Sequence, residues 1–260
     1  MKITLRHVVL FVLVAAVSWY TGTAGADPER LRVGFSQWPP WKITSGNTID
    51  GIDARILNAL ARHAGIEIEY FKCPWPRCID MFKKGELDLL TSFGRNTERE
   101  IFTHYLLPPY VTDPITFWVK KTSGRRIDSY EDLNGLRIGT TKGSMYFSRF
   151  DKDDHLNKVA VGWERQLFMM LDNNRIDAFI GYETSIKYNL VLEKYTNRFH
   201  RVAFYHPGSS SHIALSKKSK HAGLHPKLSK ALDQLVTAGE THTIIREFLS
   251  ETTASPSDFQ

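Results

Sequence analysis

The sequence of 260 residues has few of the features that mark specialised classes of protein. It holds only two cysteines, no long run of basic residues, and one long apolar segment, which lies at its N-terminus. A single apolar segment excludes a multi-span membrane protein, and scattered basic residues argue against nucleic acid as a partner. With 42% hydrophobic and 24% charged residues, the composition also excludes collagen-like and wholly disordered chains.

Motifs of common catalytic and metal sites are missing as well. The sequence has no G-x-S-x-G, no H-E-x-x-H and no phosphate-binding G-x-x-x-x-G-K-[ST]. His221 and His225 have the i, i+4 spacing of a ligand pair, but Gly223 lies between them and Pro226 follows. We interpret them as part of an exposed loop. The sequence therefore predicts neither a metal nor a cofactor.

The N-terminal apolar segment is predicted to be a signal for export. Lys2 and Arg6 precede ten apolar residues at 8–17, which are too few to span a membrane comfortably. Ala24-Gly25-Ala26 then supplies small residues for a cleavage site, with no cysteine after it to carry a lipid anchor. Cleavage after Ala26 would release the chain from Asp27 onward into the periplasm. An uncleaved anchor helix is the alternative.

Export bears on the two cysteines and on the charge. In an oxidising compartment Cys73 and Cys78 are predicted to form a local disulfide, and closing so short a loop contributes about 2 kcal/mol. Two free buried thiols are the alternative, since the spacing fits neither a zinc pair nor a C-x-x-C redox motif.

Without Lys2 and Arg6 the chain carries 32 basic and 28 acidic residues, a net charge of +4. This mildly basic balance fits a small anionic ligand.

Apolar periodicity divides the exported chain into two β-α-β-α-β units. Strands at 31–35, 66–71 and 87–90 alternate with helices at 53–64, where Asp53 is the expected N-cap, and at 77–84. The same order returns with strands at 136–140, 159–161 and 176–180 and helices at 144–150 and 164–171. This repetition predicts two lobes, each with a parallel or mixed sheet and right-handed crossovers.

Two extended segments are predicted to connect the lobes. They lie at 115–120 and 212–216, and helices at 228–236 and 243–249 follow them and return to the first lobe. Residues 27–117 would form the first part of lobe 1, residues 118–212 lobe 2, and residues 213–260 the return to lobe 1 with a polar tail from Thr253. Ligands of open parallel sheets bind beyond the carboxyl ends of the strands. The loops at 36–41, 92–99, 141–145 and 181–183 should therefore line one cleft.

The loops of the first lobe carry aromatic and cationic groups. Trp38 and Trp41 lie on a proline-rich turn and offer faces to a planar or cationic ligand part, unless one of them packs beneath the loop. Ser92, the backbone near Gly94 and the arginine fork of Arg99 suit a carboxylate. Pairing of Arg95 or Arg99 with a neighbouring surface acid is the alternative.

The loops of the second lobe offer polar groups. Ser144 and Met145 are expected at the start of a helix, where backbone N–H groups favour an anion. Tyr182 and Glu183 end a strand and are expected to face the ligand, with a solvated turn as the alternative.

The order and spacing of several motifs resemble family 3 of the bacterial extracellular solute-binding proteins, the polar amino-acid receptors of ABC importers. The resemblance covers residues 31–249. It rests on LRVGFSQWPPW at 31–41, GID at 51–53, KGELD at 84–88, NTER at 96–99, PY at 109–110 and LNGLRIG at 133–139. It implies the two-lobed periplasmic-binding-protein fold of type II, with a hinge of two strands.

The resemblance also implies roles for individual residues. The arginine that binds the ligand carboxylate falls on Arg99, and donors fall on Ser92, Gly94, Ser144 and Met145. Aromatic pocket residues fall on Trp38 and Trp41. The acid that holds an amino group falls on Tyr182, with Glu183 beside it, so the amino half of the site departs from the family pattern.

These observations predict a periplasmic, monomeric, non-enzymatic protein. It would close its lobes around a small carboxylate-bearing solute, by default an amino acid, and deliver it to an ABC permease of the inner membrane. One alternative is an enzyme on the same fold, similar to the periplasmic dehydratases of aromatic amino-acid synthesis, with Glu183 as a general acid. Another is a receptor module for a sensor kinase.

Overall fold

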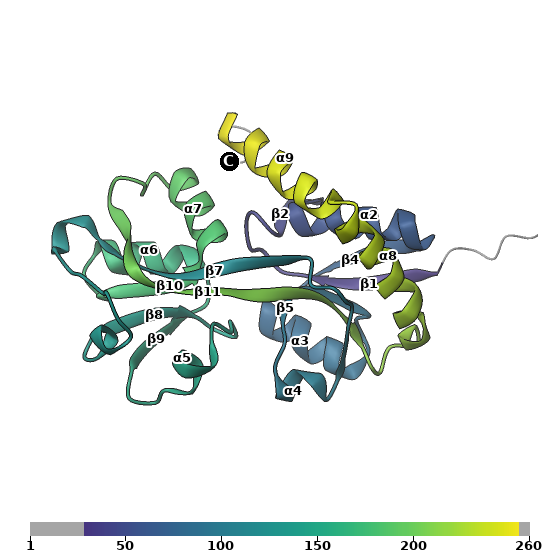
Figure 1. Cartoon of the computed structure of the whole chain (residues 1–260), viewed down its shortest axis with the longest axis horizontal. Helices are drawn as coiled ribbons and strands as arrows, with labels where there is room; N and C mark the ends of the chain where they lie inside the picture. The colour runs from purple at the N-terminus through teal and green to yellow at the C-terminus, as the bar shows by residue number, and fades with distance from the viewer. Residues whose placement is uncertain (1–28, 255–260) are drawn as a thin grey trace, which may run out of the picture.

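Two long antiparallel strands run through both halves of the molecule and join them (Figure 1). The computed structural model describes residues 29–254, so the predicted signal at 1–26 lies outside it. Within this range, β7 (Val111–Lys120) pairs with β11 (Phe199–Ser216) in a nine-stranded sheet of order β4-β1-β5-β11-β7-β10-β8-β9, with β6 on β11. The α/β class is confirmed. The sequence predicted two sheets. Because β7 and β11 are longer than predicted and pair with strands of both lobes, the structure has one continuous sheet instead.

Lobe 1 holds the parallel strands that the sequence predicts. β1 (Arg30–Phe35) pairs in parallel with β4 (Glu67–Lys72) and β5 (Leu89–Gly94). The helices α2 (Ile52–Ala64) and α3 (Trp75–Lys84) connect these strands and end at left-handed glycines, Gly65 and Gly85. The shorter elements of this lobe are β2 (Ile43–Ser45), β3 (Thr48–Asp50), α4 (Thr97–Glu100) and β6 (Thr103–Tyr105).

The start of α2 differs from the prediction, which placed Asp53 at the N-cap. Gly51 occupies the N-cap with a φ of 109°. A Cβ there would lie 2.6 Å from the carbonyl oxygen of Trp41, so both the conformation and the close approach require glycine. Asp53 lies inside the first helical turn, and its side chain is fully buried.

Lobe 2 repeats the arrangement with one helix that was not predicted. The strands β8 (Arg137–Thr141), β9 (Asn157–Val161) and β10 (Ala178–Tyr182) are parallel, and α5 (Ser148–Lys152) and α6 (Glu164–Asp172) lie between them in the chain. The additional helix is α7 (Glu183–Leu192), which follows β10 directly.

The helix predicted at 144–150 begins only at Ser148, so Ser144 and Met145 lie in a loop. Buried Tyr146 explains the difference. Its backbone N–H donates to the carboxylate of Asp151, and its hydroxyl accepts a hydrogen bond of 3.0 Å from the backbone of Thr141. The backbone around Tyr146 therefore makes hydrogen bonds that an α-helix does not contain. Ser144 and Met145 do not lie at a helix N-terminus, where the sequence analysis expected backbone N–H donors.

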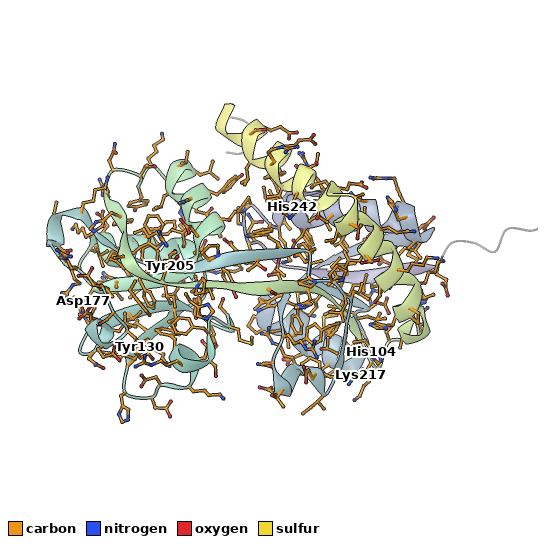
Figure 2. The ribbon with its side chains drawn as sticks, in the orientation of Figure 1. His104, Tyr130, Asp177, Tyr205, Lys217 and His242 are labelled. Carbon is orange, nitrogen blue, oxygen red and sulfur yellow. A yellow bond between two sulfur atoms is a disulfide. The ribbon has the colours of Figure 1, made fainter. Side chains whose placement is uncertain are left out.

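The same contact recurs in the two lobes. The carboxylate of Asp88 accepts from the backbone N–H of Arg32 at 2.7 Å, and that of Asp177 accepts from the backbone N–H of Arg137 at 2.9 Å. Asp177 lies at the outer end of lobe 2 (Figure 2). Each aspartate thus ties the segment just before one inner strand to a neighbouring strand, so the strands predicted at 31–35 and 87–90 in lobe 1 correspond to those at 136–140 and 176–180 in lobe 2.

The two C-terminal helices return to lobe 1, where they pack beside α2 (Figure 1). Leu228 and Leu232 of α8 (His225–Thr237) and Phe248 of α9 (Glu240–Ala254) share a core with Leu57 of α2. The helix α9 continues through Thr253, where the sequence predicted a polar tail, and residues 255–260 lie outside the described range. The predicted lobe boundaries at 117 and 212 fall within β7 and β11.

The interpretation of His221 and His225 as an exposed loop is wrong. Both side chains are half-buried. His225 is the first residue of α8, and its Nε2 lies 3.0 Å from the carbonyl oxygen of Tyr105. None of the helices between residues 29 and 254 has the length and apolar character needed to cross a membrane.

Candidate functional site

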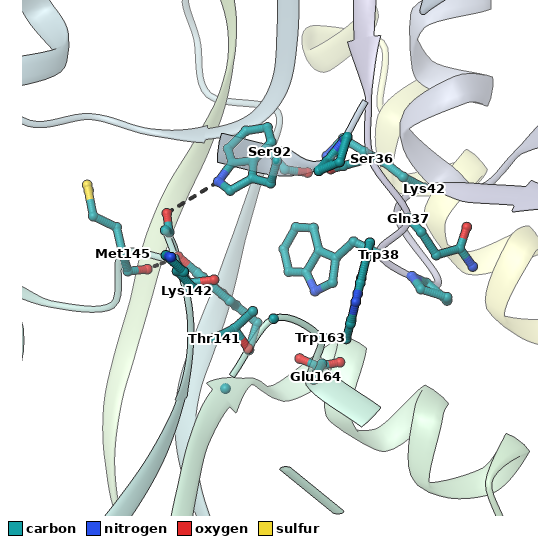
Figure 3. A pocket seen from close by; sticks show the side chains of 18 of the residues that line it. Ser36, Gln37, Trp38, Lys42, Ser92, Thr141, Lys142, Met145, Trp163 and Glu164 are labelled. Atoms are coloured by element: carbon teal, nitrogen blue, oxygen red, sulfur yellow. Dashed lines mark hydrogen bonds between the residues drawn. The ribbon is translucent and has the colours of Figure 1, made fainter. Parts of the chain in front are cut away.

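A cavity of about 560 Å³ lies between the lobes, where the carboxyl ends of β1, β5, β8 and β10 face one another. Loops from both lobes line it, and Figure 3 shows their side chains converging on it. Each of the four loops that follow the predicted strands, at 36–41, 92–99, 141–145 and 181–183, contributes at least one residue to the cavity lining. The cavity wall includes seven predicted site residues: Trp38, Ser92, Gly94, Arg99, Ser144, Met145 and Tyr182.

Trp41, another predicted site residue, does not line the cavity. Its side chain is only 2% exposed and packs in the core of lobe 1. Its carbonyl oxygen accepts the backbone N–H of Asp53 at 2.8 Å, which holds the loop against the start of α2. The turn thus directs Trp38 into the cavity and Trp41 into the core. This is the alternative given for the loop, in which one of the two tryptophans packs beneath it.

Glu183, the last of the predicted ligand residues, also lies outside the cavity lining. As the first residue of α7 it pairs with Lys187 one turn later, at 2.5 Å, and with Arg201 of β11 at 3.9 Å. Because both partners are cations of lobe 2, the carboxylate is engaged away from the ligand loops. The expectation for Glu183 is therefore corrected.

Arg99 is a buried cation at the lobe 1 wall. Asn96 caps the short helix α4 by accepting the backbone N–H of Arg99 at 2.7 Å. The guanidinium lies 4.2 Å from the centre of the Phe93 ring, and its Nη1 donates to the carbonyl oxygen of Gly94 at 3.1 Å. Burial lowers the pKa of Arg99.

No carboxylate among residues 29–254 forms an ion pair with Arg99, whereas the neighbouring Arg95 pairs with Glu100 at 2.6 Å. Of the two arginines for which pairing with a surface acid was the alternative, only Arg95 forms such a pair among residues 29–254. A buried guanidinium with unused donors attracts a carboxylate, because the carboxylate compensates its charge and accepts parallel hydrogen bonds.

A second buried cation, Lys42, was missed by the sequence analysis. Its Nζ lies 2.7 Å from Asp53, and both side chains are almost completely buried. Burial lowers the pKa of Lys42, and the carboxylate of Asp53 opposes this effect. The only signal in the sequence is the position of a lysine between Trp41 and Ile43 in an otherwise apolar stretch.

The same aspartate fixes Ser92 at the end of β5. Its carboxylate accepts the Ser92 hydroxyl at 2.6 Å and the Tyr110 hydroxyl at 2.7 Å, while Tyr110 accepts the backbone N–H of Ser92 at 2.9 Å. Ser92 has a φ of 52°, a left-handed conformation that costs free energy in a residue other than glycine. The network of Lys42, Asp53, Ser92 and Tyr110 holds this strand end in place.

Aromatic rings form another part of the wall. Trp38 packs edge-on against Tyr182, with ring centres 5.5 Å apart, and the ring centre of Tyr146 lies 6.2 Å from that of Tyr182. Trp75 and Trp163 also line the cavity, although the sequence analysis did not select them. Lys42 lies 5.3 Å from the ring centre of Trp38 and 5.7 Å from that of Trp75.

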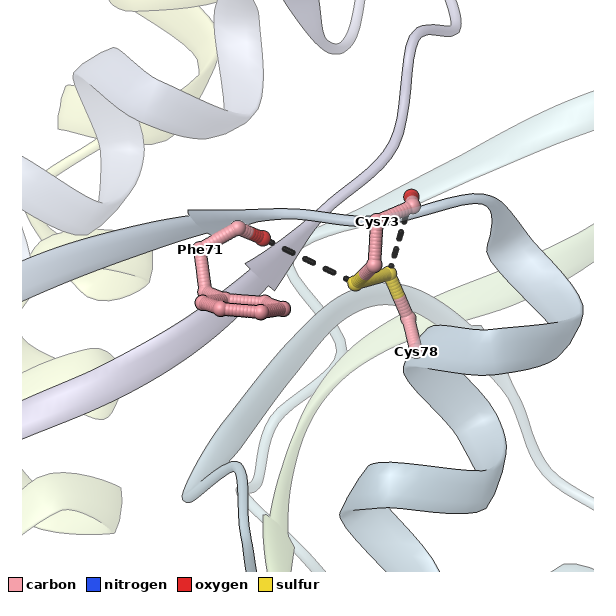
Figure 4. The surroundings of a disulfide bond; sticks show 3 residues. All are labelled: Phe71, Cys73 and Cys78. Carbon is pink, nitrogen blue, oxygen red and sulfur yellow. Dashed lines mark hydrogen bonds between the residues drawn. A yellow bond between two sulfur atoms is a disulfide. The ribbon is translucent and has the colours of Figure 1, made fainter.

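The predicted disulfide positions Trp75. Cys73 and Cys78 are bonded and link the end of β4 to α3 (Figure 4). The bridged loop, Pro74-Trp75-Pro76, reaches the cavity, and the Trp75 indole donates to the carbonyl oxygen of Gly143 in lobe 2 at 3.3 Å. Buried Cys78 anchors the loop in the core of lobe 1.

The two lobes touch directly on either side of the cavity. The hydroxyl oxygen of Ser185 lies 2.8 Å from the carbonyl oxygen of Pro39, and the side-chain amide of Asn96 lies 3.0 Å from the sulfur of Met145. Together with the hydrogen bond from Trp75 to Gly143, these contacts show that the two lobes are closed against each other.

Glu164 is a half-buried acid on the lobe 2 wall that the sequence analysis missed. Desolvation raises its pKa to about 7, although hydrogen bonds from Ser185, Asn189 and Trp38 oppose the shift. Burial also raises the pKa of the nearby Asp113, to about 6. Between residues 29 and 254 no cluster of three or more histidine, cysteine, aspartate or glutamate side chains could hold a metal ion.

Comparison with known proteins agrees with this architecture. The model of the bacterial extracellular solute-binding proteins, family 3, matches residues 31–251. A probable histidine-binding protein of Campylobacter jejuni is 22% identical over 84% of each chain, and an arginine-binding extracellular protein of Bacillus subtilis is 24% identical over 93% of this chain and 94% of its own. The structure of an ancestral arginine-binding protein bound to arginine, 22% identical, superimposes with a TM-score of 0.73 over 86% of this chain and 99% of that one.

Reduction of the disulfide should lower stability. Breaking the bond between Cys73 and Cys78 frees a short loop in the unfolded chain, so the free energy of unfolding should fall by about 2 kcal/mol. Urea unfolding with and without a phosphine reductant measures the difference. Equal midpoints would contradict the prediction.

Asp53→Asn should destabilise the protein by about 3 kcal/mol, because it leaves Lys42 buried without its counter-charge. Urea unfolding followed by circular dichroism measures the change. Asp50→Asn is the matched control, since Asp50 is partly exposed and pairs only with Arg55 at 3.4 Å; its loss should stay below about 1 kcal/mol. Similar losses in both variants would contradict a special role for Asp53.

The free energy of unfolding should fall as the pH rises through the range in which Glu164 titrates. Its pKa is raised from 4.5 to about 7, so the folded state retains a proton that the unfolded state has released. Between pH 4.5 and 7.5 the wild type, without ligand, should lose up to about 3 kcal/mol relative to Glu164→Gln. Urea unfolding at both pH values measures this difference. Parallel pH curves would be the contrary result.

Proposed function

The chain belongs to family 3 of the bacterial extracellular solute-binding proteins, and from this premise we propose that it captures a small carboxylate-bearing solute in the interlobe cavity. An amino acid is the expected ligand, in keeping with the relatives named as amino-acid-binding proteins. The observation that carries the proposal is the position of Arg99, which lines the cavity as a buried cation with no ion-pair partner among residues 29–254.

Binding would couple to closure of the lobes. A ligand carboxylate on Arg99 compensates a charge that burial otherwise leaves unfavourable. Contacts such as that of Trp75 with Gly143 form only when the lobes meet. A ligand that touches both walls therefore favours the closed state by its differential affinity.

The proposed partner is an ABC permease of the inner membrane, which would take the ligand from the closed protein. Family members are extracellular, and the apolar segment at residues 8–17, after Lys2 and Arg6, supports export by a cleaved signal. The protein would work in the periplasm as a monomer.

Arg99→Ala should weaken carboxylate binding by about 100-fold, because a buried charge-assisted pair contributes several kcal/mol to affinity. Isothermal titration calorimetry of a ligand identified by thermal-shift screening of amino acids and dicarboxylates measures the change. Arg95→Ala is the matched control, since this exposed arginine of the same loop pairs with Glu100. Unchanged affinity in Arg99→Ala would remove Arg99 from the site.

A dehydratase on the same fold is the second candidate function. The observation in its favour is Glu164, a half-buried acid on the cavity wall whose pKa desolvation raises to about 7, which is suited to proton transfer near neutral pH. This residue replaces Glu183 as the acid of that hypothesis. Incubation with prephenate and arogenate separates the functions: turnover by the wild type that Glu164→Gln abolishes would establish the enzyme, and absence of turnover favours the binding protein.

A further inference from the structure

The helix α7 of lobe 2 makes direct contact with lobe 1. Its Tyr188 is buried in the hydrophobic core of lobe 1, and its Leu192 packs against the same core. On the adjoining part of the helix, the Ser185 hydroxyl and the Asn189 amide lie 2.8 and 3.3 Å from the carbonyl oxygen of Pro39. The proline-rich turn of lobe 1 therefore rests on α7.

Glu164 joins the same contact from the start of α6. Its Oε2 lies 2.8 Å from the hydroxyl oxygen of Ser185 and 2.7 Å from the amide nitrogen of Asn189. The indole N–H of Trp38, on the turn of lobe 1, also donates to the Glu164 carboxylate (Figure 3). Because Trp38 and Pro39 belong to lobe 1, their contacts with these lobe 2 side chains exist only while the lobes are closed.

The hydrogen bonds of Ser185 favour a proton on Glu164. Its hydroxyl oxygen lies 2.8 Å from both Oε2 of Glu164 and the carbonyl oxygen of Pro39, but it carries one proton and donates to one of them at a time. When Glu164 is protonated, its Oε2–H donates to Ser185, and Ser185 donates to Pro39. Both short distances are then hydrogen bonds. An ionised Glu164 takes the Ser185 proton and leaves Pro39 without it.

Closure itself also favours the protonated acid. Desolvation raises the pKa of Glu164 to about 7, and part of the cover comes from Trp38 of lobe 1. Opening the lobes returns water to the carboxylate and lowers its pKa toward the ordinary value of 4.5. The closed state therefore holds a proton that the open state releases. This contribution favours closure below pH 7 and is lost as the pH rises through 7.

The charged groups around Glu164 do not cancel this effect. None of the ion pairs among residues 29–254 includes it, and Asp113 of β7 opposes its ionisation. Burial raises the pKa of Asp113 to about 6, so Asp113 is the other acid near by that titrates close to neutral pH. The remaining charged groups of the adjacent elements are paired, and the adjacent tyrosines have raised pKa values: Arg165 with Glu193, Lys187 with Glu183, Lys42 with Asp53, and Tyr146 and Tyr182.

We infer that Glu164, Ser185 and Asn189 form a proton-dependent latch, which holds the Trp38–Pro39 turn of lobe 1 and closes the cavity more readily as the pH falls from 8 to 6. This inference rests on the proposed function, because the latch regulates access to the same cavity. A ligand that binds by closing the lobes is then taken up together with a proton, and alkaline conditions favour its release.

Small-angle X-ray scattering of the ligand-free protein at pH 6 and pH 8 tests the latch directly. The ratio of closed to open molecules should be about 10-fold higher at pH 6, so the radius of gyration of the wild type should be smaller there. Glu164→Gln cannot change its charge and should give equal radii at both pH values. Asp113→Asn is the matched control and should retain the wild-type shift, because Asp113 bonds to Thr184 of lobe 2 and makes no latch contact.

Isothermal titration calorimetry measures the same linkage through binding. The probes are L-arginine, L-glutamine and L-phenylalanine, whose charge is constant between pH 6 and pH 8. A probe that binds the wild type should bind up to about 10-fold more tightly at pH 6 than at pH 8. Titration at pH 7 in two buffers of different ionisation enthalpy should show uptake of about half a proton. Both effects should disappear in Glu164→Gln and in Glu164→Ala, with the folding of each variant checked by circular dichroism.

The outcomes separate the latch from the proposed function. Equal wild-type radii at the two pH values together with pH-independent affinity would overturn the latch and leave the proposed function in place. A pH dependence that survives in both Glu164 variants and disappears in Asp113→Asn would overturn it as well. Should no probe bind, the proposed function loses its support, and the radii alone decide whether the latch exists.

Discussion

The pairing of β7 with β11 is the constraint on which the rest of the structure depends. The two strands run through both lobes, so they fix how the strand ends of one lobe face those of the other. Register shifts between Arg201 and Tyr205 and between His206 and Ser209 interrupt the pairing of these two strands. Gly208 permits the approach there, because a Cβ at this residue would lie 2.6 Å from Thr112. A cavity between parallel-strand ends is the direct result of this pairing.

Buried charges divide into two kinds around that cavity. Lys42 and Asp53 neutralise each other and, with Ser92 and Tyr110, hold the end of β5 rigid. Arg99 and Glu164 have no such partners among residues 29–254. The first pair stabilises the scaffold on which the ligand loops rest. Under the proposed function, a ligand carboxylate would compensate the charge of Arg99 on binding.

Local patterns were sufficient for much of the fold. Strand periodicity located β1, β4, β8 and β9 to within a few residues, and the repeated order of elements indicated two lobes. The helix α7 was missed because its apolar residues do not gather on one face. The premature helix at 144–150 was predicted because no local signal shows that Tyr146 prefers bonds to Thr141 and Asp151. Such bonds depend on residues that only the folded backbone brings near.

For the site, the sequence by itself determined the loops that reach the cleft and the arginine among them, because strand ends and charged residue types are local properties. Tertiary structure alone decided which side chains face inward. It turned Trp41 into the core, paired Glu183 with Lys187 and Arg201, and placed Lys42 and Glu164 in the cavity wall. The physical reason is that burial and ion pairing depend on neighbours distant in the chain, and periodicity carries no information about them.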